Sequence, residues 1–409
     1  MTPLPKRGRS LGRLVFIAML LGLAFGWLAS SFGIPSLVTT YIHPFGVIFI
    51  NLLKFIVVPI VLLSIVCGMI SLENVKKVGS IGFKTLAYYL ITTAIAIVIG
   101  LAVAQLFKGF FRALETANLT YEAPQSNWTE TLIKIFPSNM WSAFFSANML
   151  QVIMIALFLG SGILLAGEKG KPAAQWFHSF QDVFLGIMML IIKITPFGVF
   201  CLMSEVIVLN GPSFLGPLAV VLVVAYIAYA LHFVVVYSAA VKLLGGLSPL
   251  SFFRGMLPAM IFAFTSTSSL ATLPLTRECS KSMGADETVS SFVLPLGATM
   301  NMDGTAIYMG VVSVFIACCY GVTLTLGQML SIVLTATLAS IGTAGVSGAG
   351  PIMLAMVLES VGLPVAGIGL IMGIDKVFDM GRSCLNVVGD ASCALAISHW
   401  ERRHKKPRL

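Results

Sequence analysis

The chain has 409 residues and a net charge of +9; 58% of its residues are hydrophobic and only 10% are charged. Soluble domains carry about 25% charged residues, so this chain lacks the polar side chains that would cover a surface in water. The composition argues against soluble enzymes, nucleic-acid-binding proteins and disordered proteins, and it indicates a multi-pass membrane protein. Much of the positive charge lies at the two ends of the chain, where basic residues beside apolar spans act as topology signals.

The first apolar run covers residues 14–28 and follows a basic segment. It could be a cleaved signal peptide, but no charged residue follows before Lys54 and more apolar runs come later, so we predict a retained first span. A helix needs about 20 apolar residues to cross a bilayer. By this measure the further predicted spans are 44–71, 81–107, 145–167, 184–208, 214–242, 289–320 and 362–398.

The connections between these runs alternate in charge. The segments 73–84 and 168–171 contain lysines, whereas 29–43, 206–216 and 320–328 contain neither Lys nor Arg. Because basic connections stay in the cytoplasm, the alternation predicts eight spans with both termini cytoplasmic, in the cell (inner) membrane.

Two other apolar segments, 251–281 and 326–360, have small and polar centres, Thr265 to Ser269 in the first and Gly342 to Gly350 in the second. They could be ordinary kinked spans. They could also be re-entrant hairpins made of two half-helices, since an interrupted backbone is tolerated at membrane depth only where it lines a cavity. The charge alternation leaves no crossing for either segment, so we favour two hairpins that enter from opposite sides.

The last span carries a stripe of polar residues. Asp375, Asp379, Arg382, Asn386 and Asp390 are spaced by 4, 3, 4 and 4 residues, which places them within a sector of roughly 80° on a helix. Charged groups at membrane depth are costly and are functional by default. Asp379 and Arg382 could simply pair and hold helices together, but that would leave Asp375 and Asp390 unexplained.

The preceding span contains weak helix formers from Asn301 to Gly304. We expect the backbone to unwind there and to expose carbonyl groups. Carboxylate, amide and carbonyl oxygens suit a hard cation, and Asp303 supplies the carboxylate. Thr92 and Thr93, beside Tyr89 in the third span, could add hydroxyl ligands.

These segments together resemble the dicarboxylate/amino acid:cation symporters, the glutamate transporter family. The resemblance is carried by residues 296–305, 339–345 and 379–390 and by Thr272 to Pro274, and it extends over about 14–400. It implies an all-α multi-pass membrane protein of the elevator type, with eight transmembrane helices plus two re-entrant helical hairpins, assembled as a homotrimer.

The resemblance also implies a division of the chain into two parts. Residues 14–71 (helices 1 and 2) and 142–208 (helices 4 and 5) would form a fixed scaffold. Residues 81–107 (helix 3) and 214–400 (helix 6, the first hairpin, helix 7, the second hairpin and helix 8) would form a moving transport domain. The second hairpin would act as the outer gate.

The family's substrate site maps onto this chain residue by residue. Arg382 would hold a side-chain carboxylate, Asp379 the amino group and Asn386 the α-carboxylate. The other implied substrate contacts are Ser268, Ser269, Thr305, Val346 and Gly350. The implied sodium ligands are Tyr89, Thr92, Thr93, Gly297, Thr299, Asn301, Asp303, Ser340, Ile341, Thr343, Asn386 and Asp390. Of these, Thr299, Ser340, Ile341 and Thr343 would bind through carbonyl groups.

The chain departs from the family pattern at the arginine beside the site. Some relatives carry it at the first hairpin tip, where this chain has Thr267, and others after the aspartate of the last span, where it has Met380. Lys376 is the candidate replacement. Met309 stands where proton-coupled animal relatives carry a glutamate, which argues against proton transport by that route.

The expected function is therefore sodium-coupled symport of glutamate or aspartate, with sodium as the coupling ion and membrane lipid as the surroundings. A sodium-coupled neutral amino acid symporter and a proton-coupled glutamate/dicarboxylate symporter remain alternatives. A channel would need no Arg–Asp substrate pair. An enzyme would need a nucleophile or a metal set, and the sequence contains neither pattern; no nucleic-acid partner is expected.

Overall fold

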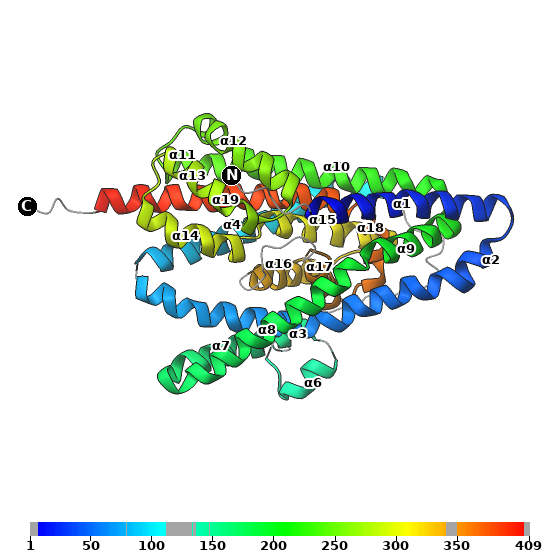
Figure 1. Ribbon diagram of the computed structural model, residues 1–409, viewed down its shortest axis with the longest axis horizontal. Coiled ribbons are helices and arrows are strands. Elements are labelled where there is room, and N and C mark those ends of the chain that lie inside the picture. Colours follow the sequence, from blue (N-terminus) through cyan, green and yellow to red (C-terminus); the bar gives the residue numbers. More distant parts are fainter. Residues whose placement is uncertain are drawn as a thin grey trace, which may run out of the picture.

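The computed structural model shows a bundle of helices, elongated along one axis (Figure 1). In the part of the chain that it describes, every regular element is helical, which confirms the all-α class. The described residues are 7–78, 80–111, 133, 136–146, 148–340 and 350–404.

We group the helices into two sets. The first set comprises α1 (Arg7–Ser31), α2 (Pro35–Leu37), α3 (His43–Val78), α6 (Met140–Phe145), α7 (Met149–Leu165), α8 (Lys171–Lys193) and α9 (Thr195–Asn210). The second set comprises α4 (Ser80–Phe107), α10 (Leu215–His232), α11 (Ser238–Leu243), α12 (Pro249–Ser266), α13 (Ser269–Ser282), α14 (Glu287–Met300), α15 (Asp303–Cys319), α16 (Leu326–Ser340), α17 (Gly350–Ser360), α18 (Ile368–Ile371) and α19 (Asp375–His404). Contacts also run between the sets, as between α17 and α3 and between α18 and α9.

Small residues allow the closest helix contacts. A side chain at Gly22 or Gly26 of α1 would collide with the backbone of α9 at Phe200 and Ser204, so this pair of glycines, four residues apart, lets the two helices touch along their length. Gly100 of α4 makes the same kind of approach to α15. In the other contacts α3 lies against α7, α8 and α9, while α19 lies against α12, α13, α14 and α15.

Within the described residues, six stretches are long and apolar enough to cross a membrane. They are Leu14–Ser31, Pro35–Ile70, Ser80–Phe110, Gly167–Lys193, Leu215–Leu243 and Glu287–Cys319. The chain is thus a membrane protein, as its composition predicted.

One predicted span is wrong in its boundaries. The run 184–208 is not a single helix, because α8 ends at Lys193 and α9 starts at Thr195. Pro196, in the first turn of α9, has no N–H to continue the hydrogen bonding of a preceding helix, and apolar periodicity alone does not reveal that break. The last predicted span also differs, since α19 begins only at Asp375 and runs on to His404.

The first predicted hairpin segment forms a helical hairpin. Helices α12 and α13 have 18 and 14 residues and pack against each other. They meet at Thr267, the C-cap of α12, which has the left-handed angles φ 55° and ψ 36°. In the second segment α16 and α17 have 15 and 11 residues, fewer than a crossing helix requires; the predicted tip between them lies outside the described residues.

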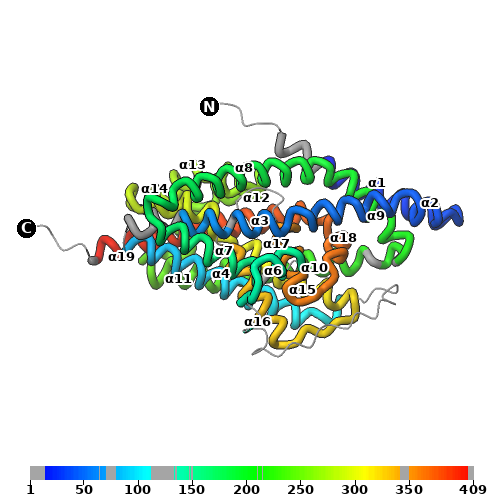
Figure 2. The backbone as a smooth tube through the Cα atoms, turned by 90° about the horizontal axis from the view of Figure 1, so that it is seen from below, coloured from blue at the N-terminus to red at the C-terminus, as the bar shows by residue number. Residues whose placement is uncertain are grey.

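Two irregularities interrupt the helices near the centre of the molecule. The backbone is not helical at Asn301 and Met302, between α14 and α15, which confirms the expected unwinding. A π-helical segment, Phe233–Tyr237, joins α10 to α11. Helix α15, which follows the break at Asn301 and Met302, is buried along almost its whole length. Figure 2 shows the same bundle turned by 90°.

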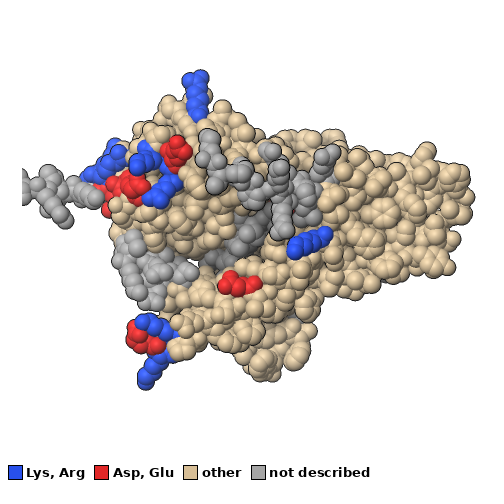
Figure 3. Space-filling model, viewed as in Figure 1, with Lys and Arg blue, Asp and Glu red and all other residues tan. Residues whose placement is uncertain are grey.

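Charged side chains on the visible face gather mostly toward the end where α19 finishes, while the opposite end shows almost none (Figure 3). At the charged end, where α19 finishes, Arg277 and Lys281 contact Glu287 at 2.5 and 2.7 Å, and Lys84 contacts Glu401 at 2.8 Å.

Candidate functional site

Arg382 lies at the centre of a buried charged cluster and is only 1% exposed. Its Nη2 donates to Asp379 Oδ1 at 3.1 Å and to Asp375 Oδ2 at 3.4 Å, and its Nη1 lies 3.4 Å from Asp375 Oδ1. The guanidinium stacks over Tyr308, 4.2 Å from the ring centroid. Nη1 of Arg382 has no hydrogen-bond partner among the described groups, so the cation keeps a donor that an anionic ligand could use.

Lys376 is a second cation at this cluster. Its ammonium group donates to Thr267 Oγ1 at the tip of the first hairpin and lies 3.4 Å from Asp379 Oδ2. The contact joins the start of α19 to the turn between α12 and α13. Asp379 therefore receives Arg382 on one oxygen and Lys376 on the other.

Asn386 connects α19 to the break between α14 and α15. Its side-chain oxygen accepts the Gly304 N–H at 2.8 Å, and its backbone oxygen accepts Nδ2 of Asn301 at 3.0 Å. The same amide of Asn301 donates to Asp390 Oδ1 at 2.9 Å. Oδ1 of Asn301 is buried and has no partner among the described groups. A buried amide oxygen of this kind is a ready ligand for a cation.

Asp303, at the first position of α15, is completely buried and accepts several hydrogen bonds. Oδ1 accepts the hydroxyls of Thr93 at 2.7 Å and Thr92 at 3.3 Å, both from α4. Oδ2 accepts the hydroxyl of Tyr237 at 2.8 Å and lies 3.3 Å from Nε2 of His232. The predicted grouping of Asp303 with the two threonines is present.

Gly297 lies against two further predicted ligands. A Cβ at this position would collide with the hydroxyl of Tyr89 and the carboxylate of Asp390, so both side chains approach the backbone of α14 closely. Tyr89 donates to the carbonyl of Val293 at 3.1 Å. Tyr89, Gly297 and Asp390 are thus neighbours, although they come from three helices.

Four other predicted substrate residues, Thr305, Ser268, Ser269 and Gly350, lie in the described part of the chain. Thr305 and Asn386 both contact Met302 Sδ, at 3.7 and 3.5 Å, so Thr305 lies close to Asn386. Ser268 caps α13 and Ser269 is buried at the same tip. The backbone of Gly350 lies against the guanidinium of Arg382, since a Cβ at this position would collide with it.

Two predicted sodium ligands have only local hydrogen bonds. Thr299 donates to Leu296 O at 2.9 Å and Ser340 to Thr337 O at 2.7 Å. The prediction for these two residues concerns their carbonyl groups, so it stays a prediction. Three predicted residues, Ile341, Thr343 and Val346, lie outside the described residues.

The sequence reasoning missed three residues of the site, Tyr308, His232 and Tyr237. His232 and Tyr237 are five residues apart, which on an α-helix would place them on different faces. The π-helical segment brings both to Asp303, as such segments often do at functional sites. The only signal in the sequence was their polarity within the apolar run 214–242.

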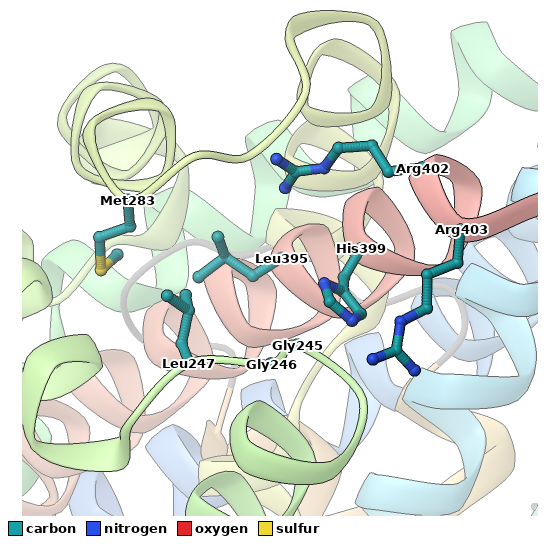
Figure 4. A pocket seen from close by; sticks show the side chains of 8 residues that line it. All are labelled: Gly245, Gly246, Leu247, Met283, Leu395, His399, Arg402 and Arg403. Carbon is teal, nitrogen blue, oxygen red and sulfur yellow. The ribbon is translucent and has the colours of Figure 1, made fainter. Parts of the chain in front are cut away.

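A cavity of about 390 Å³ lies elsewhere, near the end of α19. Figure 4 shows its lining residues, Gly245, Gly246, Leu247, Met283, Leu395, His399, Arg402 and Arg403. None of them belongs to the clusters described above. Arg402 there holds the helix end in place by donating to Gly284 O at 2.6 Å and Ser398 O at 3.2 Å.

Among the described residues, no three His, Cys, Asp or Glu side chains gather as a transition-metal site would require. The buried groups instead form two linked sets. One presents a guanidinium and carboxylates, as a charged organic ligand would require, and the other presents carboxylate, amide and hydroxyl oxygens, as a hard cation would require.

Known proteins resemble the whole chain. Residues 11–400 match the model of the sodium:dicarboxylate symporter family. The chain is 34% identical to the proton/sodium-glutamate symport protein of Geobacillus stearothermophilus, over 96% of this chain and 95% of that protein. It is 33% identical to the proton/glutamate-aspartate symporter of Escherichia coli (strain K12), over 98% and 94%. It is 32% identical to the C4-dicarboxylate transport protein of Bacillus subtilis (strain 168), over 88% and 87%.

The family match and the similarity over nearly full length agree with the buried charged clusters and the apolar helices. The resemblance seen in the sequence is confirmed. The chain belongs to the sodium:dicarboxylate symporter family, and it is a membrane symporter rather than an enzyme.

Proposed function

We propose that the chain carries glutamate or aspartate across the cell membrane together with sodium. The observation that carries the proposal is the buried Arg382 between Asp375 and Asp379. A single buried cation that keeps a free donor can grip the side-chain carboxylate of an acidic amino acid. Asp379 then offers a carboxylate for the ammonium group, and Asn386 and the first hairpin tip offer hydrogen bonds for the α-carboxylate.

The cation proposal rests on the oxygen atoms around the break between α14 and α15. Asp303 supplies a buried carboxylate with two threonine hydroxyls on it. Asn301 supplies a buried amide oxygen without a described partner. A bound sodium ion would satisfy that oxygen and would compensate the charge of Asp303, whose removal from water is otherwise costly.

Proton coupling is the second candidate for the ion, because several relatives are named proton/sodium or proton symporters. Met309, completely buried in α15, has no titratable group. That residue therefore gives no support to a proton route at its position, and the oxygen-rich groups favour sodium.

The two sets of helices support a division into scaffold and transport domain. The substrate and cation residues described above lie on helices of the second set or on the segments that join those helices: α4, α10, the π-helical segment, α12 to α17 and α19. We propose that this set moves as a body past α1, α3, α7, α8 and α9 in an elevator mechanism, within a homotrimer whose termini are cytoplasmic.

The decisive experiment is uptake into liposomes that contain the purified protein. An inward sodium gradient should drive accumulation of radiolabelled L-glutamate or L-aspartate above equilibrium. Proton gradients without sodium should give no accumulation. Equal uptake under a proton gradient in sodium-free buffer would refute the sodium proposal, and uptake of neither amino acid under any gradient would refute the substrate proposal.

A further inference from the structure

We propose that Lys376 is a built-in counter-ion for Asp379 that takes the place of a substrate's ammonium group, and so determines how strictly the site requires that group. This role rests on the function proposed above, because it concerns the same substrate site.

Lys376 contacts the carboxylate of Asp379, the group that a substrate's ammonium would bind. Its Nζ lies 3.4 Å from Asp379 Oδ2, while Arg382 occupies Oδ1. An α-ammonium group that binds Asp379 would need the same Oδ2 lone pairs. Lys376 presents the same chemical group as the substrate, a primary ammonium with three donors.

Thr267 keeps the lysine in this position. The hydroxyl of Thr267 donates to the carbonyl of Ser266 at 2.7 Å, so its oxygen lone pairs face the incoming Lys376 ammonium as acceptors. Thr267 is 1% exposed and has φ 55°, an angle that a β-branched residue adopts only when its surroundings hold it there. The bond from Lys376 is one of the interactions that hold it.

The charges of the cluster balance without a substrate. Asp375 and Asp379 carry two negative charges, and Lys376 and Arg382 carry two positive charges. Arg382 contacts both carboxylates, and Lys376 contacts Asp379. If Lys376 were neutral, the cluster would be net negative, and an acidic amino acid, which carries one negative charge less than the matching dicarboxylate, would be repelled less than the dicarboxylate.

Two consequences follow for recognition. A dicarboxylate without an amino group is not repelled by the full negative charge of Asp379, because Lys376 already neutralises that charge. An amino acid must compete with Lys376 for Asp379. The lysine therefore narrows the difference in affinity between an acidic amino acid and the dicarboxylate of the same carbon skeleton.

The test compares pairs that differ only by the amino group, L-aspartate with succinate and L-glutamate with glutarate. Calorimetry on the purified full-length protein in sodium gives the ratio of dissociation constants within each pair. For the pair that binds, Lys376→Met should raise the ratio of the dicarboxylate's dissociation constant to the amino acid's by about tenfold or more. The main cause should be weaker binding of the dicarboxylate. Lys376→Arg, which keeps the charge, should retain the wild-type ratio.

Lys84→Met is the matched control. Lys84 is also a lysine in an ion pair, and its side chain has the same exposed fraction, 28%, but its partner is Glu401 at the far end of α19. This control should leave the ratio unchanged. Lys376→Gln, measured alongside, gives a second neutral variant should Lys376→Met fail to fold.

The outcomes separate this role from the function itself. If the wild type binds none of the four compounds in sodium, the substrate proposal fails. If it binds an amino acid but the preference changes by less than about twofold in the neutral variants, Lys376 has no such role. A wild type that prefers the amino acid by more than about a thousandfold would also overturn it, because Asp379 would then behave as if uncompensated.

Discussion

Gly350→Ala should weaken substrate binding while leaving the fold intact. Gly350 is the first residue of α17, and a Cβ there would lie 2.5 Å from Cζ and 2.8 Å from Nη2 of Arg382. Ordinary contacts begin at 3.4 Å and Nη1 of Arg382 would lie closer still to the Cβ, so the guanidinium would have to move by more than about 1 Å. The bond from Nη2 to Asp379, now 3.1 Å, would then exceed hydrogen-bond length.

The cost should appear in affinity rather than in stability, because the obstructing atoms are the far end of a flexible side chain. A displacement of about 1 Å at a positioned recognition group costs up to about 100-fold in function. We expect the dissociation constant for glutamate or aspartate to rise by about 10- to 100-fold. The melting temperature without substrate should change little, since alanine is the better helix former.

The assay is isothermal calorimetry in sodium, with thermal unfolding as the check on folding. Gly162→Ala in α7 is the control, because nothing lies within 4 Å of a Cβ there; it should leave affinity unchanged. If Gly350→Ala bound the acidic amino acid as tightly as the wild type, the guanidinium of Arg382 would not be the carboxylate-binding group.

Three further predictions concern the same clusters. Arg382→Ala should abolish measurable binding of acidic amino acids, because an unpaired carboxylate in this buried site costs several kcal/mol; uptake of labelled aspartate and of neutral amino acids such as serine by the variant checks it. Asp303→Asn should raise the half-saturating sodium concentration for uptake by about tenfold, since it removes a ligand charge, and sodium titration of transport would show no shift if Asp303 were only structural. Sodium and substrate should bind cooperatively and reciprocally, so calorimetry across a roughly hundredfold sodium range should show substrate affinity rising with sodium, and a flat affinity would contradict the coupling.

The sequence was most informative where one periodicity acted over a long stretch. The stripe from Asp375 to Asp390 was correctly placed on one buried helix, since spacings of three and four residues repeat with the α-helix. The break at Asn301 was predictable from weak helix formers. The hairpin at Thr267 followed from the polar centre of an apolar segment.

Other features could not be predicted because they depend on contacts between distant segments. Nothing local in the sequence places Tyr308 under Arg382, although both are buried on helices that pack together. His232 and Tyr237 both contact Asp303 only because a π-helical segment joins α10 to α11, and the apolar sequence there does not predict such a segment. The interruption at Ile194 did have a local signal, since Lys193, Thr195 and Pro196 stand beside it, but the length of the apolar run alone did not reveal it.

The hydrogen bonds of Asn386 suggest how the two proposed ligands influence each other. Asn386 is four residues from Arg382 on α19, yet its side chain and carbonyl bind Gly304 and Asn301 at the break between α14 and α15. The amide of Asn301 also holds Asp390. A cation that binds the free oxygen of Asn301 would fix the orientation of this amide, and with it the segment of α19 that faces the substrate. The first ligand to bind meets the entropic cost of ordering this segment, and the second ligand then binds without that cost. Such shared hydrogen bonds are therefore sufficient for positive coupling without any large rearrangement.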